Sequence, residues 1–167
     1  MKIAILLPYK ENFSPEYPGA VSLFINDTSL SSKYKKNIKV YGNTNFKNIF
    51  KINYVNIGLN KFLLGSQSKQ YINKFIVFER KVKSDLIEIH NRPNYLKHIL
   101  KRLNKRNITL FFHNDPLSMD GSKTLEERKF LLKNCFRIIF NSNWSKNRFL
   151  ELLENKYINS EKLLVFF

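Results

Sequence analysis

Short apolar runs alternate with amphipathic segments along the chain, and this alternation predicts the fold. Runs with the length and composition of buried strands lie at residues 2–8, 37–42, 52–58 (the weakest), 85–91, 107–114, 135–142 and 161–167. Helical patterns lie between them: a segment with Val21, Phe24, Ile25 and Thr28 on one face, and segments 66–83, 93–106, 122–134 and 143–155. Continuous apolar runs are typical of parallel strands that are covered on both faces. The sequence therefore predicts an α/β domain with a doubly wound, mostly parallel Rossmann-like sheet and helices on both faces.

Composition agrees with one globular domain over residues 1–167. The 167 residues are 43% hydrophobic and include 15 Phe and 8 Tyr, too many for a disordered chain. The single cysteine, Cys135, cannot form an intrachain disulfide, which fits a reducing compartment. Pro8 interrupts the first apolar run before it reaches the length of a signal-peptide core. We therefore expect a cytoplasmic protein.

The formal net charge of +16 changes this picture only partly. Such a charge favours partners that are nucleic acids, anionic membrane surfaces or phosphorylated substrates. The chain is also rich in Lys, Asn, Ile and Phe together, a combination that AT-rich coding produces, so both explanations of the charge stay open.

Polar residues gather where the predicted strands end. His90 and Asn91 follow the fourth strand, and His113 and Asn114 follow the fifth. The carboxyl ends of parallel strands form the ligand edge of a doubly wound sheet. Histidine titrates near neutrality and can hydrogen-bond a phosphate or a sugar hydroxyl. One such histidine has an ordinary structural explanation, whereas two on the same edge favour a functional site.

Other motifs at this edge have local explanations. Gly19 after Pro18 lets backbone amides approach an anion at a helix N-terminus, but a helix-opening turn explains it equally well. Ser142 or Asn143 serves as the N-cap of the last helix, and Trp144 either packs against the sheet or covers a ligand. The sequence contains no spaced dinucleotide-binding glycines, no phosphate loop, no nucleophile elbow and no His/Cys cluster with metal-ligand spacing.

Five segments in this order resemble one family. They are "KIAILLP", the glycine-bearing first loop, "DLIEIHNRP", "ITLFFHNDP" and "RIIFNSNWSKNRF". Together they are similar to the N-terminal domain of GT-B-fold glycosyltransferases of the subfamily 4 (group 1) type, over essentially the whole chain. The resemblance implies an enzyme of two Rossmann-like domains, in which the N-terminal domain holds the acceptor and the C-terminal domain binds the nucleotide-sugar.

The resemblance also implies roles for individual residues. Pro18 and Gly19 would form the loop at the donor phosphates, and His113 would be the catalytic residue that reaches the transferred sugar. The residues implied on the acceptor side are His90, Asn91, Arg92, Asn114, Asp115, Ser142 and Trp144. The implied substrates are a nucleotide-sugar and a glycan or lipid-linked acceptor, with no metal and no other cofactor.

Two departures from the family pattern bear on activity. The first loop has one glycine where many relatives have two, and no pair of glutamates has the family's Glu-x7-Glu spacing, which Glu154 and Glu161 miss by one residue. In the family that pair lies in the C-terminal domain, so we expect this chain to be one half of an enzyme: a truncated product, an isolated domain or a split subunit. Alone it should be inactive, because stabilisation of the leaving group lies in a C-terminal domain supplied in cis or in trans.

One alternative stays open, namely a non-enzymatic basic α/β module that binds nucleic acid or another polyanion. Such a module needs lysines and arginines on one face with exposed aromatic residues between them. Here most aromatic residues fall at core-spaced positions, so nucleic acid is the less favoured partner. With the glycosyltransferase interpretation, the charge predicts a peripheral contact with the anionic inner face of a membrane or with a phosphate-bearing acceptor.

Overall fold

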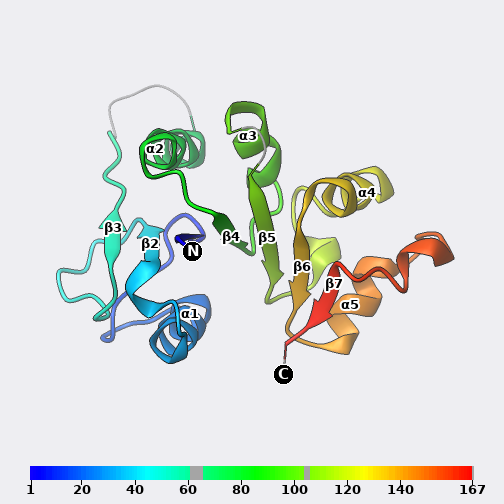
Figure 1. The fold of residues 1–167 in the computed structure, drawn as a ribbon, viewed down its shortest axis with the longest axis horizontal. Coiled ribbons are helices and arrows are strands. Elements are labelled where there is room, and N and C mark those ends of the chain that lie inside the picture. The colour runs from blue at the N-terminus through cyan, green and yellow to red at the C-terminus, as the bar shows by residue number, and fades with distance from the viewer. Residues whose placement is uncertain (61–65, 104–105, 167) are drawn as a thin grey trace.

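The computed structural model describes residues 1–60, 66–103 and 106–166, and it contains a seven-stranded sheet (Figure 1). The strand order is β3-β2-β1-β4-β5-β6-β7, and every neighbouring pair is parallel. The strands are β1 (Ile3–Leu6), β2 (Ile38–Gly42), β3 (Tyr54–Asn56), β4 (Leu86–His90), β5 (Asn107–Phe112), β6 (Arg137–Phe140) and β7 (Leu163–Val165). The chain builds outward from β1 in one direction and then, after β3, crosses back to β4 and builds in the other. The predicted doubly wound parallel sheet is confirmed.

In the described part of the chain, five helices connect the strands. They are α1 (Ala20–Ser31), α2 (Gln67–Val82), α3 (Tyr95–Arg102), α4 (Leu125–Asn134) and α5 (Asn143–Leu150). Thr124 and Glu127 form a capping box that starts α4, because each side chain accepts a hydrogen bond from the other residue's backbone N–H. Three short 3-10 turns complete the described structure: η1 (Lys35–Asn37), η2 (Pro116–Ser118) and η3 (Asn155–Tyr157).

The two faces of the sheet are covered unequally. Side chains of α2, α3, α4 and α5 join one large apolar cluster, whereas the smaller cluster on the opposite face takes its helical residues from α1. Figure 1 shows α1 on the other side of the strands from α2, α3 and α4. Beside α1, a cavity of about 280 Å³ is lined partly by Phe24, Glu88, Phe111 and Phe166. The middle strands therefore keep a partly open face next to α1.

Several element boundaries differ from the sequence prediction. The helix predicted at 122–134 begins only at Leu125, because the buried Ser122 hydroxyl instead donates to the Pro116 carbonyl. The helix predicted at 143–155 ends at Leu150, and Leu152 has a left-handed φ of 61°, which a continuing helix excludes. Each strand in the structure is shorter at one or both ends than the apolar run that predicted it. The strand in the weakest run, 52–58, contains only three paired residues. Of the segment predicted as a helix at 93–106, residues 104–105 lie outside the described part.

Candidate functional site

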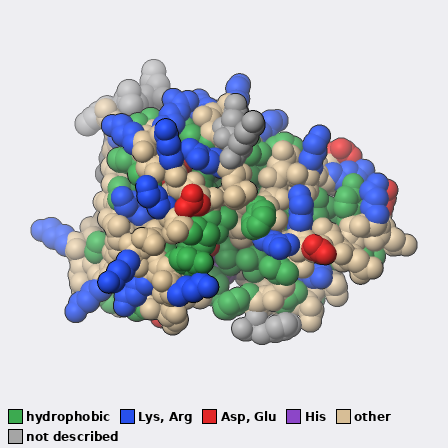
Figure 2. Space-filling model, in the orientation of Figure 1, with side chains coloured by type: hydrophobic (Ala, Val, Ile, Leu, Met, Phe, Trp, Pro, Cys, Tyr) green, Lys and Arg blue, Asp and Glu red, His purple; other side chains and the backbone are tan. Residues whose placement is uncertain are grey.

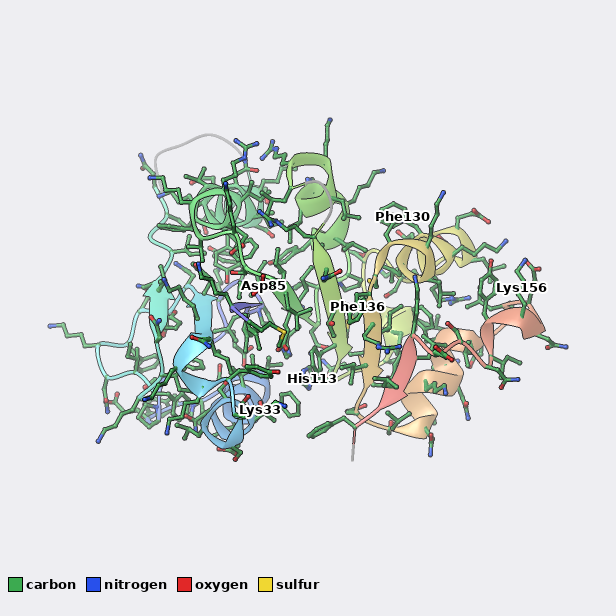
Figure 3. The ribbon with its side chains drawn as sticks, viewed as in Figure 1. Lys33, Asp85, His113, Phe130, Phe136 and Lys156 are labelled. Carbon is green, nitrogen blue, oxygen red and sulfur yellow. The ribbon has the colours of Figure 1, made fainter. Side chains whose placement is uncertain are left out.

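The structure brings the two predicted histidines together. His90 is the last residue of β4, and His113 follows directly after the neighbouring strand β5. His90 Nδ1 lies 2.9 Å from His113 Nε2, which is hydrogen-bond distance. Figure 3 shows His113 beyond the lower end of β5, on the side of α1. The adjacency of the two strands thus turns two histidines that are 23 positions apart into one pair.

Both imidazole rings are enclosed by aromatic side chains. His90 is 1% exposed, and its ring stacks on Phe111 with 4.4 Å between ring centroids. Phe24 of α1 meets the His113 ring edge to face at 4.9 Å. Burial, and secondly the neighbouring His90, lowers the pKa of His113 from 6.5 to about 3. His113 is therefore neutral at physiological pH, and it can act there as a hydrogen-bonding group but not as a cation.

Amide side chains tie the two histidine loops to each other. Asn91 adopts a left-handed φ of 51°, and its Oδ1 accepts a 2.7 Å hydrogen bond from the His113 backbone N–H. The Arg92 guanidinium donates to the Asn91 carbonyl at 2.7 Å. Asn141, after β6, donates from Nδ2 to the His113 carbonyl at 2.8 Å. Asn91, which was predicted on the acceptor side, therefore also holds the loop of His113, and Arg92 bonds to the Asn91 carbonyl. Asn141 is a second residue that holds this loop, and the sequence prediction missed it.

Of the remaining residues that were predicted on the acceptor side, two cap helices and two are exposed on the surface. Asp115 accepts from the Leu117 N–H at 3.0 Å to start η2, and it pairs with Arg148 at 3.4 Å. Ser142 is the N-cap of α5 and accepts from the Ser145 N–H at 3.1 Å. Asn114 is exposed. Trp144 is 59% exposed, with the Arg148 guanidinium over its ring, so it does not pack into the sheet.

The first loop already holds an internal carboxylate where the sequence predicted a donor phosphate. Gly19 is the N-cap of α1. The Glu11 carboxylate accepts from the Ser22 N–H at 3.2 Å and from the Ser22 hydroxyl at 3.4 Å, close to the positive end of the helix. A Cβ atom on Gly19 would lie only 1.8 Å from Glu11 Oε1. A side chain at position 19, next to Pro18, would therefore displace the Glu11 carboxylate from this place. A glutamate that precedes a helix N-terminus is the sequence signal for this arrangement.

A second, open site lies at the carboxyl ends of β1, β2 and β3. It is a cleft of about 600 Å³, here called the amide cleft, lined by Tyr9, Lys10, Asn12, Asn43, Thr44, Asn45, Asn56, Gly58, Leu59 and Gln67. Among these described lining residues Lys10 is the one cation, and none is an Asp or Glu. The sequence prediction missed this cleft, although "GNTN" after the second strand carries the signal.

Hydrogen bonds fix part of the amide cleft before any ligand binds. Asn43 donates from Nδ2 to the Ile57 carbonyl at 2.8 Å, which leaves its Oδ1 as an acceptor. Asn56 accepts from the Thr44 N–H at 3.0 Å and donates to the Thr44 carbonyl at 3.1 Å. Tyr9 donates its hydroxyl to Gln67 Oε1. The cleft therefore offers preorganised neutral donors and acceptors, which is the chemistry that hydroxyl groups match.

On the face that Figure 2 shows, the positive charge is spread rather than concentrated. Figure 2 shows lysines and arginines scattered over the whole visible face, with apolar side chains between them near its middle. In the described ranges no group of three or more His, Cys, Asp or Glu side chains has the geometry of a metal site. None of the described helices is both long and apolar enough to cross a membrane.

Comparison with known proteins identifies the fold. No protein-family model matches the chain, and a search of curated proteins gives no significant match. Among solved structures, Anabaena Alr3699/HepE in complex with UDP-glucose is similar over 100% of this chain and 44% of its own, with 16% identity and a TM-score of 0.63. A UDP-N-acetylglucosamine 2-epimerase from Rickettsia bellii matches over 99% of this chain and 44% of its own, at 13% identity and a TM-score of 0.58.

A third similar structure is sucrose-phosphate synthase from Thermosynechococcus elongatus, with 9% identity, a TM-score of 0.58, and coverage of 99% of this chain and 47% of its own. The chain thus spans less than half the length of each of these proteins. At these identities the likeness concerns the fold alone, and it shows that the described residues form a Rossmann-like α/β domain similar to one part of each of these larger proteins.

Proposed function

We propose that the chain is the N-terminal, acceptor-side half of a GT-B glycosyltransferase. The observation that carries this proposal is that a neutral, half-buried His113 and the amide cleft both lie at the carboxyl edge of the sheet. The likeness to HepE, whose structure was determined with UDP-glucose and with UDP, supports a nucleotide-sugar as the donor. A C-terminal domain, in the same polypeptide or in another, would bind that donor.

In this proposal the amide cleft binds the carbohydrate part of a glycan or lipid-linked acceptor. Asn43 Oδ1 accepts from a sugar hydroxyl, and the Asn12 and Asn45 amides supply both donors and acceptors without a charge. Tyr9 adds an aromatic surface, and Lys10 adds one cation. His113 contacts the transferred sugar where the two domains meet. A peripheral contact of the basic surface with anionic lipid would bring a lipid-linked acceptor near the cleft.

Binding of neutral sugars to the ¹⁵N-labelled chain tests the acceptor site. We expect maltotriose or cellotriose at millimolar concentration to shift the side-chain amide signals of Asn12, Asn43 and Asn45 in ¹H–¹⁵N spectra. Asn45→Ala should weaken that binding several-fold, and Asn147→Ala, an exposed asparagine on α5, serves as the matched control. Unshifted amide-cleft signals with both sugars, together with steeply salt-dependent binding of arbitrary oligonucleotides, would support the basic nucleic-acid-binding module instead.

Turnover in the complete two-domain enzyme tests His113. His113→Ala should abolish transfer while the fold is retained, and His98→Ala, on the exposed face of α3, should leave transfer unchanged. Unchanged turnover of the His113 variant would contradict its catalytic role. Residues 1–167 alone should show no transfer, because in this proposal a C-terminal domain binds the donor.

A further inference from the structure

A carboxylate faces the far side of the histidine pair. Glu88 and His90 lie two residues apart on β4, so their side chains share one face of the sheet. Glu88 Oε2 lies 3.7 Å from His90 Nε2, and the other ring nitrogen of His90, Nδ1, faces His113 Nε2 at 2.9 Å. The three side chains therefore form a line from a carboxylate through one imidazole to the next.

The carboxylate decides which nitrogens carry protons. His90 Nε2 is buried and has no hydrogen-bond partner among the described residues. A lone pair on that nitrogen would face the negative Glu88 at 3.7 Å, whereas an N–H there is attracted to it. With the proton on Nε2, neutral His90 has its lone pair on Nδ1. His113 Nε2 must then carry the proton and donate to His90, which leaves His113 Nδ1 unprotonated.

We infer that Glu88 and His90 are positioning residues that fix His113 in the tautomer protonated on Nε2, so that His113 accepts a hydrogen bond at Nδ1. An acceptor matches a sugar hydroxyl, which can donate, and it does not match a fully ionised phosphate oxygen, which cannot. The use of this tautomer rests on the proposed function, because it assigns His113 to the hydroxyls of a sugar. The tautomer itself is a property of the isolated chain.

Long-range ¹H–¹⁵N NMR of the imidazole rings measures the tautomer directly near neutral pH. We expect His113 to show a pyrrole-like Nε2 and a pyridine-like Nδ1, with a preference of about tenfold or more, equivalent to about 1.4 kcal/mol. The exposed His98 ring provides the baseline tautomer ratio. The signals that disappear in the His98→Gln variant are those of His98.

Two variants remove the positioning groups separately. Glu88→Gln removes the charge, and His90→Phe keeps an aromatic ring on Phe111 but removes the Nδ1 acceptor. Each should move the His113 tautomer ratio several-fold toward the His98 baseline, and Glu126→Gln on the exposed face of α4 should not. A protonated Nδ1 on wild-type His113, or an unmoved ratio in Glu88→Gln and His90→Phe, would overturn the inference.

Transfer by the complete enzyme separates this inference from the proposed function. If Glu88→Gln changes the tautomer and also lowers kcat with little change in KM for the donor, both the positioning role of Glu88 and the catalytic role of His113 are supported. If the tautomer changes and transfer does not, the positioning role stands and the catalytic role of His113 fails. Because the NMR measurement needs no substrate, it gives a result in either case.

Discussion

The histidine pair and the amide cleft lie on the same carboxyl edge of one sheet, yet their polar groups differ in what they contact. At the ends of β4 and β6, the side chains of His90, Asn91 and Asn141 bond to His113 after β5, and His90 and Asn91 are buried. At β1 to β3, amides line an open cleft of about 600 Å³. Polarity at a strand end therefore marks two kinds of site, one that holds the protein's own loops and one that faces outward.

The position of the strands explains the difference. β4 and β5 are central, so the loops that follow them have neighbours on both sides and their backbone groups are partly buried. Buried backbone N–H groups must find partners, and the buried Asn91 side chain supplies one for the part-buried His113 N–H. Asn141 adds a bond to the more exposed His113 carbonyl. β2 and β3 lie at one side of the sheet, where Asn43 and Asn56 also bond to loop backbone, but the Asn12 and Asn45 side chains line the open cleft.

We call the histidine pair with its partners Asn91 and Asn141 the closed site. The largest effect that we predict there is a loss of stability in acid. The pKa of His113 is lowered in the folded state from 6.5 to about 3, so its contribution to stability is present above pH 6.5 and is lost as the pH falls toward 3. We expect wild-type stability, relative to its neutral-pH value, to fall by about 3 kcal/mol more than that of His113→Phe by about pH 4.5. Urea unfolding across pH measures this difference, with His98→Phe as control. Parallel pH profiles for wild type and His113→Phe would show that His113 is not a buried neutral histidine.

Asn91 tests whether the closed site is structural. Asn91→Ala removes the acceptor of the His113 N–H and places alanine at a φ of 51°, so we expect a loss of about 2 kcal/mol in the free energy of unfolding. Asn91→Gly, which tolerates this φ, should recover about 1 kcal/mol of that loss. Equal stability of both variants and wild type, measured by urea unfolding, would place the His113 loop outside the cooperative fold.

Substitutions of Gly19 and Glu11 test whether the polar groups of the first loop, like those of the closed site, bond within the protein. Gly19→Ala should displace the Glu11 carboxylate from Ser22 and cost about 1 kcal/mol. In a Glu11→Ala background the same change should cost much less, so a double-mutant cycle gives a clear coupling energy. Additive effects would mean that Glu11 does not hold the α1 terminus, and the glycine would then be free to serve a phosphate.

The fold could be predicted from the sequence because apolar runs report directly on buried strands. The runs at 2–8 and 107–114 contain β1 and β5, and their alternation with helical segments was enough for the parallel sheet. Boundaries were less accurate where a local contact decides them, as at Ser122 and Leu152. The first depends on one side-chain hydrogen bond within a tight loop and the second on one backbone angle, and the pattern of apolar positions reports neither.

The candidate site could be predicted only in part, for a related reason. His90 and His113 were found because each directly follows an apolar run, and strand adjacency does the rest. Glu88 was not found, because it lies inside a strand and its role depends on the side chain two positions further on. The amide cleft was not found, because Asn12 and Asn43 follow β1 and β2 while Asn56 ends β3, and only the folded sheet brings these three segments together.

The smallest stability effect is expected in the amide cleft, and it completes the comparison. Asn12→Ala and Asn45→Ala should each change the free energy of unfolding by less than about 0.5 kcal/mol, because both side chains line an open cleft rather than a packed loop. Asn43→Ala should cost about 1 kcal/mol, since it loses the hydrogen bond to the Ile57 carbonyl. Urea unfolding of these three variants and of Asn91→Ala ranks their losses in the free energy of unfolding. A loss at Asn45 as large as that at Asn91 would show that the cleft, too, is built to hold the protein rather than a ligand.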